Sequence, residues 1–321
     1  MKVVRIYEQG PPEVLKYEEG PQPQPKEGEA LVELKAIGVN FTDVYTRLGT
    51  YPAKLPAVIG MEGAGVVSAI GTDVTSVNAG DLVAYTNVLG AYAEYAAVPA
   101  SRLVRIPQGL DPQTAAAVLL QGMTAHYLVN DTFPLKKGDT ILVHAAAGGV
   151  GRLLVQMAKH MGTRVIATVS SEEKARIARD AGADSVIVYT KQDFEEEVKR
   201  ETNGQGVSVA YDSVGRTTFE KSLRCLRPRG YLVLFGQSSG IVPPVAPSVL
   251  QKGSLFLTRP MLGDYTATRE ELERRAASVF DMVLSEELRV NTFKTLPLSQ
   301  ASEAHRLLEG RLSTGKLLLV P

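Results

Sequence analysis

The strongest chemical signal in the chain is a run of small residues that follows an apolar segment. Residues 141–143 are apolar, and the loop from Ala145 to Gly151 contains glycines at positions 148, 149 and 151. A strand that ends in glycines and leads into a helix points backbone N–H groups and the positive end of the helix dipole at one place. This spacing predicts a binding site for the pyrophosphate of a dinucleotide.

The residues of this loop differ in what they could do. Gly148 would let a phosphate approach the backbone, and Gly151 would let the helix pack closely on the sheet. Ala146 stands where the first glycine of the fingerprint G-x-G-x-x-G belongs, so the motif is incomplete. A strand-to-helix turn without a ligand is the alternative interpretation. The order of strand, loop and helix favours the ligand site.

The end of the next apolar run indicates which dinucleotide would bind. It reads Thr168-Val169-Ser170-Ser171, with no acidic residue before Glu172, and Lys174 lies one helical turn further on. An acidic side chain here would bind the ribose diol of NAD, whereas hydroxyls and an ammonium suit a 2′-phosphate. We therefore expect NADPH rather than NADH. Ser170 or Ser171 can also cap the following helix, which is compatible with phosphate binding.

The elements that must position this loop follow from the hydrophobic pattern. From residue 139 onward, continuous apolar runs alternate with amphipathic segments, as in a parallel sheet covered by helices on both faces. The predicted strands are 140–144, 164–169, 185–189, 207–212 and 231–235, with a sixth at 254–258, and the predicted helices are 150–161, 171–181, 193–202 and 217–227. The fold class is therefore α/β, with a doubly wound Rossmann domain.

The first 110 residues show a different pattern. Short β-branched runs at 3–7, 31–37, 65–70, 81–86 and 91–98 are separated by Gly, Pro, Asn and Asp. This spacing predicts a β-rich domain with partial barrel closure. A helix follows from Asp111, whose side chain can cap it, with Pro112 in the first turn and the alanine-rich 114–129 behind. The tail holds helices at 268–286 and 299–310 and a strand at 316–320. Periodicity leaves open which domain the tail joins.

Composition favours a small molecule as the partner. The 321 residues include 35 basic and 35 acidic side chains, so no strong field would attract nucleic acid or an anionic membrane. A single cysteine, Cys225, excludes an internal disulfide framework and a thiolate cage for structural zinc. The sequence shows neither a signal peptide nor an apolar run of about 20 residues, so we expect a cytoplasmic protein without a membrane span.

Six segments, in order along the chain, carry a family pattern. They are Asn40-Phe41-Thr42-Asp43-Val44-Tyr45, Pro56 to Gly65, Ala145 to Gly151, Tyr211 to Gly215, Gly253 to Pro260 and Thr314-Gly315-Lys316. Together they resemble the quinone oxidoreductase (zeta-crystallin) branch of the medium-chain dehydrogenase/reductase superfamily, over essentially the whole chain. The resemblance implies a GroES-like catalytic domain formed by residues 1–120 and completed by 260–321, and a Rossmann NADPH-binding domain over 121–259.

The resemblance also bears on metal binding. In zinc-dependent relatives a cysteine lies at the position of Asn40 and a histidine at that of Met61, both as ligands of catalytic zinc. Neither residue of this chain offers a thiolate or an imidazole, so we expect no metal and disfavour alcohol dehydrogenation. The expected reaction is hydride transfer from NADPH to an acceptor activated by its own conjugation, such as a quinone or an α,β-unsaturated carbonyl.

The resemblance places Asn40, Asp43, Tyr45 and Tyr51 in the catalytic cleft. Tyr45 and Tyr51 are candidates for phenolic donors, Asn40 for an amide hydrogen bond to the ribose or the acceptor, and Asp43 for orienting its neighbours. The alternatives are a packing role for Tyr51 and a structural hydrogen-bonding role for Asp43. The residues expected to contact the coenzyme are Asn40, Tyr45, Thr124, Gly148, Gly149, Val150, Gly151, Ser170, Lys174, Tyr189, Ser213, Phe235, Gly236, Ser238, Phe256 and Lys316.

Two further functions compete with quinone reduction. An alkenal or enoyl reductase of the same class presents an equally electron-poor double bond to the hydride. A non-catalytic crystallin-like or RNA-binding role has no support in the balanced charge or in any basic, aromatic motif. The short apolar run 253–258 at a sheet edge leads us to expect a homodimer. We interpret His144, at the end of a buried strand, as a core imidazole.

Overall fold

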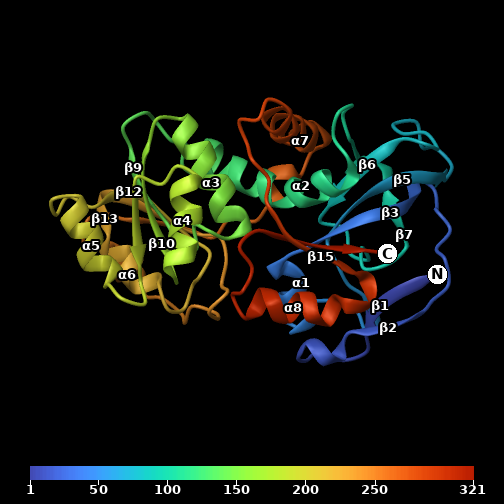
Figure 1. The fold of residues 1–321 in the computed structure, drawn as a ribbon, viewed down its shortest axis with the longest axis horizontal. Coiled ribbons are helices and arrows are strands. Elements are labelled where there is room, and N and C mark those ends of the chain that lie inside the picture. Colours follow the sequence, from blue (N-terminus) through green and yellow to red (C-terminus); the bar gives the residue numbers. More distant parts are fainter. The chain divides into compact units, whose positions relative to one another are not determined.

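The computed structural model describes all 321 residues, which form two compact units. Unit 1 comprises residues 1–123 and 266–321, and unit 2 comprises residues 124–265. Both chain termini therefore belong to unit 1 (Figure 1). The changes from one unit to the other come a few residues later than the expected domain boundaries at 120/121 and 259/260. No helix combines the length and the apolar character that a membrane crossing requires.

Unit 2 contains a six-stranded sheet in the order β11-β10-β9-β12-β13-β14, and every pairing is parallel. This is the doubly wound order of dinucleotide-binding folds, which starts at a central strand and extends in both directions. The strands are β9 (Thr140–Val143), β10 (Arg164–Val169), β11 (Ser185–Val188), β12 (Val207–Asp212), β13 (Leu226–Leu234) and β14 (Phe256–Thr258). The predicted fold class is confirmed.

Four helices connect these strands and accompany the sheet (Figure 1): α3 (Gly149–His160), α4 (Glu172–Asp180), α5 (Phe194–Glu201) and α6 (Phe219–Arg224). Helix α6 is shorter than the predicted 217–227, because β13 already begins at Leu226, five residues before the predicted strand. The last strand, β14, begins at Phe256 rather than 254. Ser254 has a left-handed φ of 50°, which interrupts extended structure.

Unit 1 contains a seven-stranded sheet, in which the order β15-β16-β3-β5-β6-β8 is completed by β7 on β3, and a smaller sheet in the order β2-β1-β4. The strands are β1 (Lys2–Ile6), β2 (Lys16–Glu19), β3 (Glu29–Val39), β4 (Ala57–Val58), β5 (Glu62–Ile70), β6 (Leu82–Thr86), β7 (Tyr95–Pro99), β8 (Val104–Arg105), β15 (Thr292–Pro297) and β16 (Lys316–Val320). The C-terminal β16 pairs antiparallel with β3, so the tail completes this sheet.

One predicted strand in this unit is confirmed only in its second half. The run 91–98 is extended only from Tyr95, and residue 93 makes an isolated bridge to Val3 instead of joining a strand. Tyr92 is fully buried there, and its amide binds the carbonyl of Ile59. The apolar pattern of residues 91–94 therefore reflects burial in the core rather than strand pairing.

Helices α1 (Phe41–Arg47), α7 (Arg269–Leu284) and α8 (Ala301–Glu309) belong to unit 1, and α2 (Pro112–Tyr127) begins in it. Asp111 caps α2 as predicted, since its Oδ1 accepts the N–H groups of Gln113 at 2.8 Å and Thr114 at 2.9 Å. The chain then continues as a π-helical turn, η3 (Leu128–Thr132). Five short 3₁₀ turns complete the structure: η1 (Pro12–Val14), η2 (Ala100–Arg102), η4 (Pro247–Leu250), η5 (Asp264–Thr266) and η6 (Leu298–Gln300).

Candidate active site

The glycine-rich loop of unit 2 leaves the start of α3 open. Ala145 adopts a left-handed φ of 50°, and its carbonyl accepts the N–H of Gly148 at 2.8 Å. Gly148 is the N-cap residue of α3 and supplies no side chain to cap it. The N–H groups of Gly149, Val150 and Gly151 lie in the first turn, where no helical carbonyl can accept them. These amides and the helix dipole suit a diphosphate.

Gly151 explains why the loop can be this tight. A Cβ at this position would lie 2.3 Å from the carbonyl oxygen of Ala145 and 2.9 Å from Cα of Ala146, closer than any side chain allows. A Cβ at Gly148 would meet only that same oxygen, at 3.1 Å. Gly151 therefore serves the packing of α3 on the strand end, as predicted from the sequence, and Gly148 lies at the open side.

The carboxyl ends of two neighbouring parallel strands, β12 and β13, lie at the same edge of the sheet. Ser213 follows β12, and Phe235 and Gly236 follow β13. The N–H of Ser238 donates to the carbonyl of Ser213 at 3.1 Å, and a Cβ at Gly236 would lie 2.6 Å from that carbonyl oxygen. Because β12 pairs with β9, the structure brings these four predicted residues to the carboxyl edge that also carries the glycine loop.

The residues expected at the 2′-phosphate also share one edge. Ser170 and Ser171 follow β10, and Ser171 caps α4 by accepting the backbone N–H of Lys174 at 3.3 Å. Tyr189 follows the adjacent β11, donates its N–H to the carbonyl of Val169 at 3.0 Å, and keeps 38% of its surface exposed. Between the end of β10 and Glu172 the chain has no acidic residue. The group therefore offers hydroxyls and one cation, which suits a phosphate.

Two predicted coenzyme residues lie elsewhere in unit 2. The ring of Phe256 stacks on Tyr231 at a centroid distance of 4.4 Å, at the first residue of β14 rather than at the carboxyl edge. Thr124 is buried within α2.

His144 is a core imidazole, as interpreted from the sequence. Its Nδ1 lies 2.8 Å from Oγ1 of Thr168, and its Nε2 lies 2.9 Å from Oγ of Ser222. Burial lowers the pKa of His144 below its usual range, so the ring is neutral. Both nitrogens are occupied, which leaves none for a ligand.

In unit 1 the polar centre is a buried trio of Asn40, Glu62 and Lys316. The Lys316 ammonium lies 2.5 Å from Oε2 of Glu62 and 2.8 Å from Oδ1 of Asn40, and Lys316 is only 1% exposed. Oε1 of Glu62 accepts the N–H of Leu120 at 2.7 Å. Gly38 makes room for this carboxylate, because a Cβ there would lie 2.1 Å from Oε2. Sequence reasoning missed Glu62, although it lies within one of the family segments.

The side chain of Asn40 is almost fully engaged. Its Nδ2 donates to Glu62 at 2.9 Å and to the carbonyl of Gly38 at 3.2 Å, while Oδ1 accepts from Lys316 and, at 3.4 Å, from Gln121. Only the long contact to Gln121 is weak enough to give way to a ligand. Lys316, predicted to touch the coenzyme, instead has its ammonium bound to Glu62 and Asn40.

Asp43 is fully buried in the first turn of α1. Its Oδ2 accepts the backbone N–H of Asn40 at 2.8 Å and the hydroxyl of Tyr92 at 3.1 Å, while Oδ1 has no partner. Burial raises the pKa of Asp43 to about 7, against the opposing effects of the Asn40 amide and the Lys316 charge. Asp43 is therefore a hydrogen-bond partner of Asn40 and Tyr92, which agrees with the structural role that was one of its two interpretations.

The two predicted tyrosines lie together. The rings of Tyr45 and Tyr51 meet edge to face at a centroid distance of 5.3 Å, and the Tyr51 N–H donates to the carbonyl of Tyr45 at 3.1 Å. Tyr45 is 8% exposed, whereas Tyr51 is half-buried. Tyr51 thus packs on Tyr45 while part of its surface stays exposed. The structure contains no group of three or more His, Cys, Asp and Glu side chains that could hold a metal ion.

Comparison with known proteins agrees with both units. The family of alcohol dehydrogenase GroES-like domains matches residues 26–108, and the zinc-binding dehydrogenase family matches residues 149–278. A quinone oxidoreductase of Pseudomonas aeruginosa is 45% identical over 100% of this chain and 99% of its own length. Quinone oxidoreductase 1 of Escherichia coli is 43% identical over 99% of both chains. A 2-haloacrylate reductase of Burkholderia is 41% identical over 98% of both chains.

Solved structures are similar over the same extent. A mycobacterial protein complexed with NADPH is 47% identical, with a TM-score of 0.97 and full coverage of both chains. The Escherichia coli quinone oxidoreductase complexed with NADPH is 42% identical, with a TM-score of 0.98 and full coverage of both chains. The resemblance inferred from the six sequence segments is confirmed.

Proposed function

The chain belongs to the quinone oxidoreductase family of the medium-chain dehydrogenase/reductase superfamily, and from that membership we propose that it is an NADPH-dependent reductase of quinones that needs no metal ion. The observation that carries the proposal is the uncapped start of α3 behind a loop that only glycine permits at Gly151. This arrangement fits the diphosphate of a dinucleotide.

The preference for NADPH rests on the ends of β10 and β11. Ser170, Ser171, Lys174 and Tyr189 offer a phosphate hydroxyl donors and a positive charge, and no carboxylate lies among them to bind a ribose diol. When bound, the coenzyme supplies the hydride. The first-turn amides of α3 would hold its diphosphate, and the residues after β12 and β13, Ser213 and Gly236 among them, lie at the same edge of the sheet.

Independence from metal is supported by the surroundings of Asn40. Its oxygen already accepts a hydrogen bond from the buried Lys316 ammonium, which also neutralises Glu62. A divalent cation at this place would meet a fixed positive charge at short range in a poorly screening interior. Neither Asn40 nor the nearby Met61 is a customary zinc ligand. The ammonium also fixes the orientation of the Asn40 amide through its hydrogen bond to Oδ1.

For the acceptor, the two tyrosines are the side chains best suited to touch it. Tyr51 is half-buried and can donate a phenolic hydrogen bond to an oxygen that gains negative charge, while Tyr45 supports its ring. Asp43 is fully buried, so it positions Asn40 and does not touch the acceptor. A conjugated acceptor needs few further catalytic groups, because holding it in line with the hydride donor supplies much of the rate enhancement.

Reduction of an activated alkene is the second candidate. It is favoured by one observation, the 41% identity with a relative named 2-haloacrylate reductase. Such a substrate presents an electron-poor double bond to the same hydride, and its carboxylate or carbonyl oxygen could accept the same phenolic donor.

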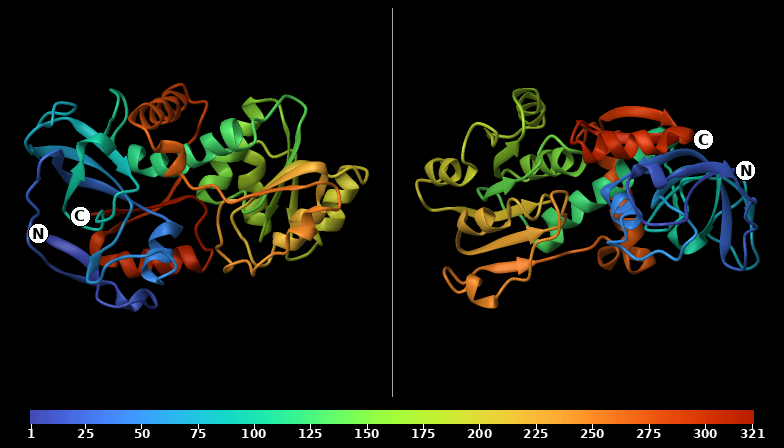
Figure 2. Two further views of the ribbon diagram at one scale, coloured as in Figure 1. Left: turned by 180° about the vertical axis from the view of Figure 1, so that it is seen from behind. Right: turned by 90° about the horizontal axis from the view of Figure 1, so that it is seen from below.

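We also propose that the protein is a homodimer joined through β14. This strand pairs with β13 on one side only, and it lies at the outer edge of the sheet in the right-hand view of Figure 2. Phe256 and Leu257 are 47% and 37% exposed there. An unpaired edge with exposed apolar side chains can pair with its copy across a twofold axis.

The function is tested by measuring NADPH oxidation with 1,4-benzoquinone, 9,10-phenanthrenequinone, a 2-alkenal and 2-chloroacrylate, each with and without a chelator. We expect the quinones to give the highest kcat/KM and the chelator to have no effect. Turnover confined to the alkenal or the haloacrylate would establish the second candidate instead. Loss of quinone turnover on chelation would refute the metal-free mechanism.

A further inference from the structure

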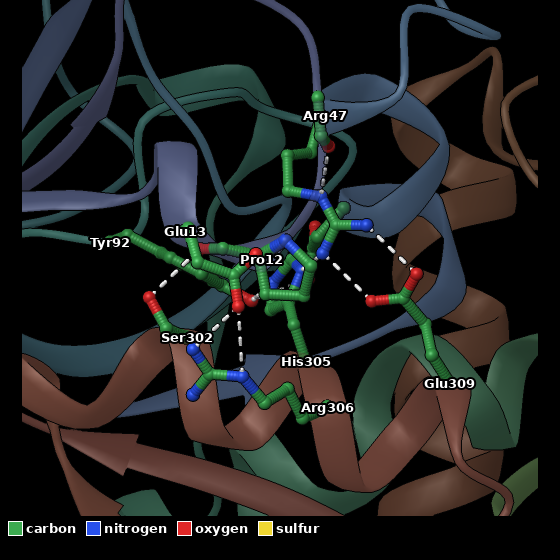
Figure 3. A network of polar contacts seen from close by, with 10 residues as sticks. Pro12, Glu13, Arg47, Tyr92, Ser302, His305, Arg306 and Glu309 are labelled. Atoms are coloured by element: carbon green, nitrogen blue, oxygen red, sulfur yellow. Dashed lines mark hydrogen bonds and ion pairs between the residues drawn. The ribbon is translucent and has the colours of Figure 1, made fainter.

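A polar network that the proposed reaction does not use joins α1 to α8, and Glu309 is its one partly exposed member. Arg47, at the end of α1, is 0% exposed and binds both carboxylate oxygens of Glu309 at 2.8 Å. Its NH1 also lies 3.0 Å from Nδ1 of His305. Figure 3 shows how Arg47 reaches the α8 residues His305 and Glu309, with Tyr92 beside the imidazole. Further along, Nε2 of His305 lies 2.9 Å from the hydroxyl of Tyr92.

The chemistry of these groups fixes the direction of every hydrogen bond. A guanidinium has only donors, so Nδ1 of His305 must accept from Arg47. Burial and the Arg47 charge lower the pKa of His305 to about 3, so the ring is neutral and its one proton is on Nε2. That N–H donates to the Tyr92 oxygen. The single Tyr92 proton is then left to donate to Oδ2 of Asp43, 3.1 Å away.

The donors therefore run one way, from Arg47 through His305 and Tyr92 to Asp43. A second donor to Oδ2 is the backbone N–H of Asn40. The Tyr92 hydroxyl and the Asn40 N–H stabilise the ionised form of Asp43, and so does the charge of Lys316 on β16. Burial and the negative charge of Glu62 on β5 favour the protonated form. Because Oδ2 receives both donors and Oδ1 has no partner, a proton on Asp43 would lie on Oδ1.

We propose that Arg47, His305 and Tyr92 form a one-way chain of hydrogen-bond donors that sets the charge on Asp43 and so fixes the first turn of α1. His305 is a positioning residue in this chain. An ionised Asp43 accepts the Asn40 N–H more strongly than a neutral one. The chain of hydrogen bonds thereby holds Asn40 in place, and with it Tyr45, which lies further along the same helix. The link from Asp43 to turnover rests on the proposed function, whereas the direction of the chain does not.

The direction is tested on the unaltered protein by nitrogen NMR of labelled histidines. His305 is identified by its contact with the Tyr92 ring, whose centroid lies 5.8 Å from that of the imidazole. We expect a neutral ring with its proton on Nε2 at every pH from about 5 to 9. A proton on Nδ1, or a titration of His305 within that interval, would overturn the proposal without any reference to enzymatic activity.

The effect on Asp43 is tested with Tyr92→Phe, which removes the last donor of the chain. We expect the pKa of Asp43, followed by carboxyl carbon NMR, to rise by about one unit, since a hydrogen bond to a charged group is lost. The acid limb of kcat/KM for the quinone should move up by the same amount, with little change in KM for NADPH.

Tyr85→Phe is the matched control. Tyr85 is 1% exposed in the same core cluster as Tyr92, and its hydroxyl has no partner. The same substitution there should leave the pKa of Asp43 and the pH profile unchanged. Equal shifts in both variants, or no shift with Tyr92→Phe, would refute the role of the chain. If the pKa of Asp43 rises in a protein that reduces no quinone, only the proposed function fails.

Discussion

Lys316 and Glu62 place opposite charges in the interior of unit 1, with side chains that are 1% and 0% exposed. Removing one partner of such a pair costs about 3–5 kcal/mol, because the other charge is left buried and unpaired. The Lys316 ammonium therefore stays with Glu62 and Asn40. There it donates a hydrogen bond to Oδ1 of Asn40 and so orients the amide.

The choice of coenzyme is also decided by single residues. Replacing Lys174 by Ala removes the cation near the predicted 2′-phosphate, and we expect KM for NADPH to rise about tenfold or more while KM for NADH changes little. Steady-state kinetics with both coenzymes measure this. Lys199→Ala, which removes a charge from the exposed face of α5, is the control. An equal effect of Lys174→Ala on both coenzymes would rule out the phosphate contact.

At the scale of elements, the junction of β9 and α3 depends on close approach of two backbones. Helix α3 starts within a few residues of the strand it packs on, so the loop folds back with Ala145 in a left-handed conformation. Only a residue without a side chain fits at Gly151, where the Ala145 carbonyl lies across the path of a Cβ. The packing of α3 on the strand and the position of the phosphate site therefore both require glycine at 151.

Gly151→Ala tests this requirement. The new methyl must displace the Ala145 backbone, and we expect a loss of about 1–3 kcal/mol in the free energy of unfolding together with weaker NADPH binding. Denaturant titration and isothermal calorimetry measure the two effects. Gly263→Ala is the control, since nothing lies within 4 Å of a Cβ there and its φ is not left-handed. Unchanged NADPH affinity in Gly151→Ala would contradict the placement of the diphosphate.

At the scale of the whole molecule, the chain crosses between the units twice. It leaves unit 1 within α2 and returns at η5, after which the tail adds β16 to the sheet that begins with the first residues. The last element of unit 2 before this return is β14, whose outer edge is unpaired. The edge strand thus lies where a second copy could extend the sheet.

If the dimer forms through β14, a charged side chain introduced into this strand should separate the two copies. Leu257→Lys should convert a dimer into a monomer in light scattering at micromolar concentration, because two like charges would face each other across the twofold axis. Leu89→Lys introduces the same charge at a leucine of unit 1 that is 41% exposed, and it should leave the mass unchanged. A monomeric mass of the unaltered protein would end the proposal.

The sequence by itself determined the features that depend on neighbours along the chain. The alternation of apolar runs and amphipathic segments gave the α/β class and the parallel strands, with most strand ends within one or two residues. The glycines before α3, the missing acid after β10 and the Asp111 cap are likewise local. Local errors arose where burial imitated a strand, at 91–94, and where a left-handed residue, Ser254, delayed one.

Only the tertiary structure decided which distant side chains meet. Lys316 and Glu62 are 254 positions apart, Arg47 and Glu309 are 262 apart, and Tyr92 and His305 are 213 apart. No periodicity marks such residues, because each pairing arises when β16 and α8 return to unit 1 and bury charges that must then find partners. The nucleotide loop follows from adjacent residues, whereas the charges that hold Asn40 and Asp43 exist only in the folded chain.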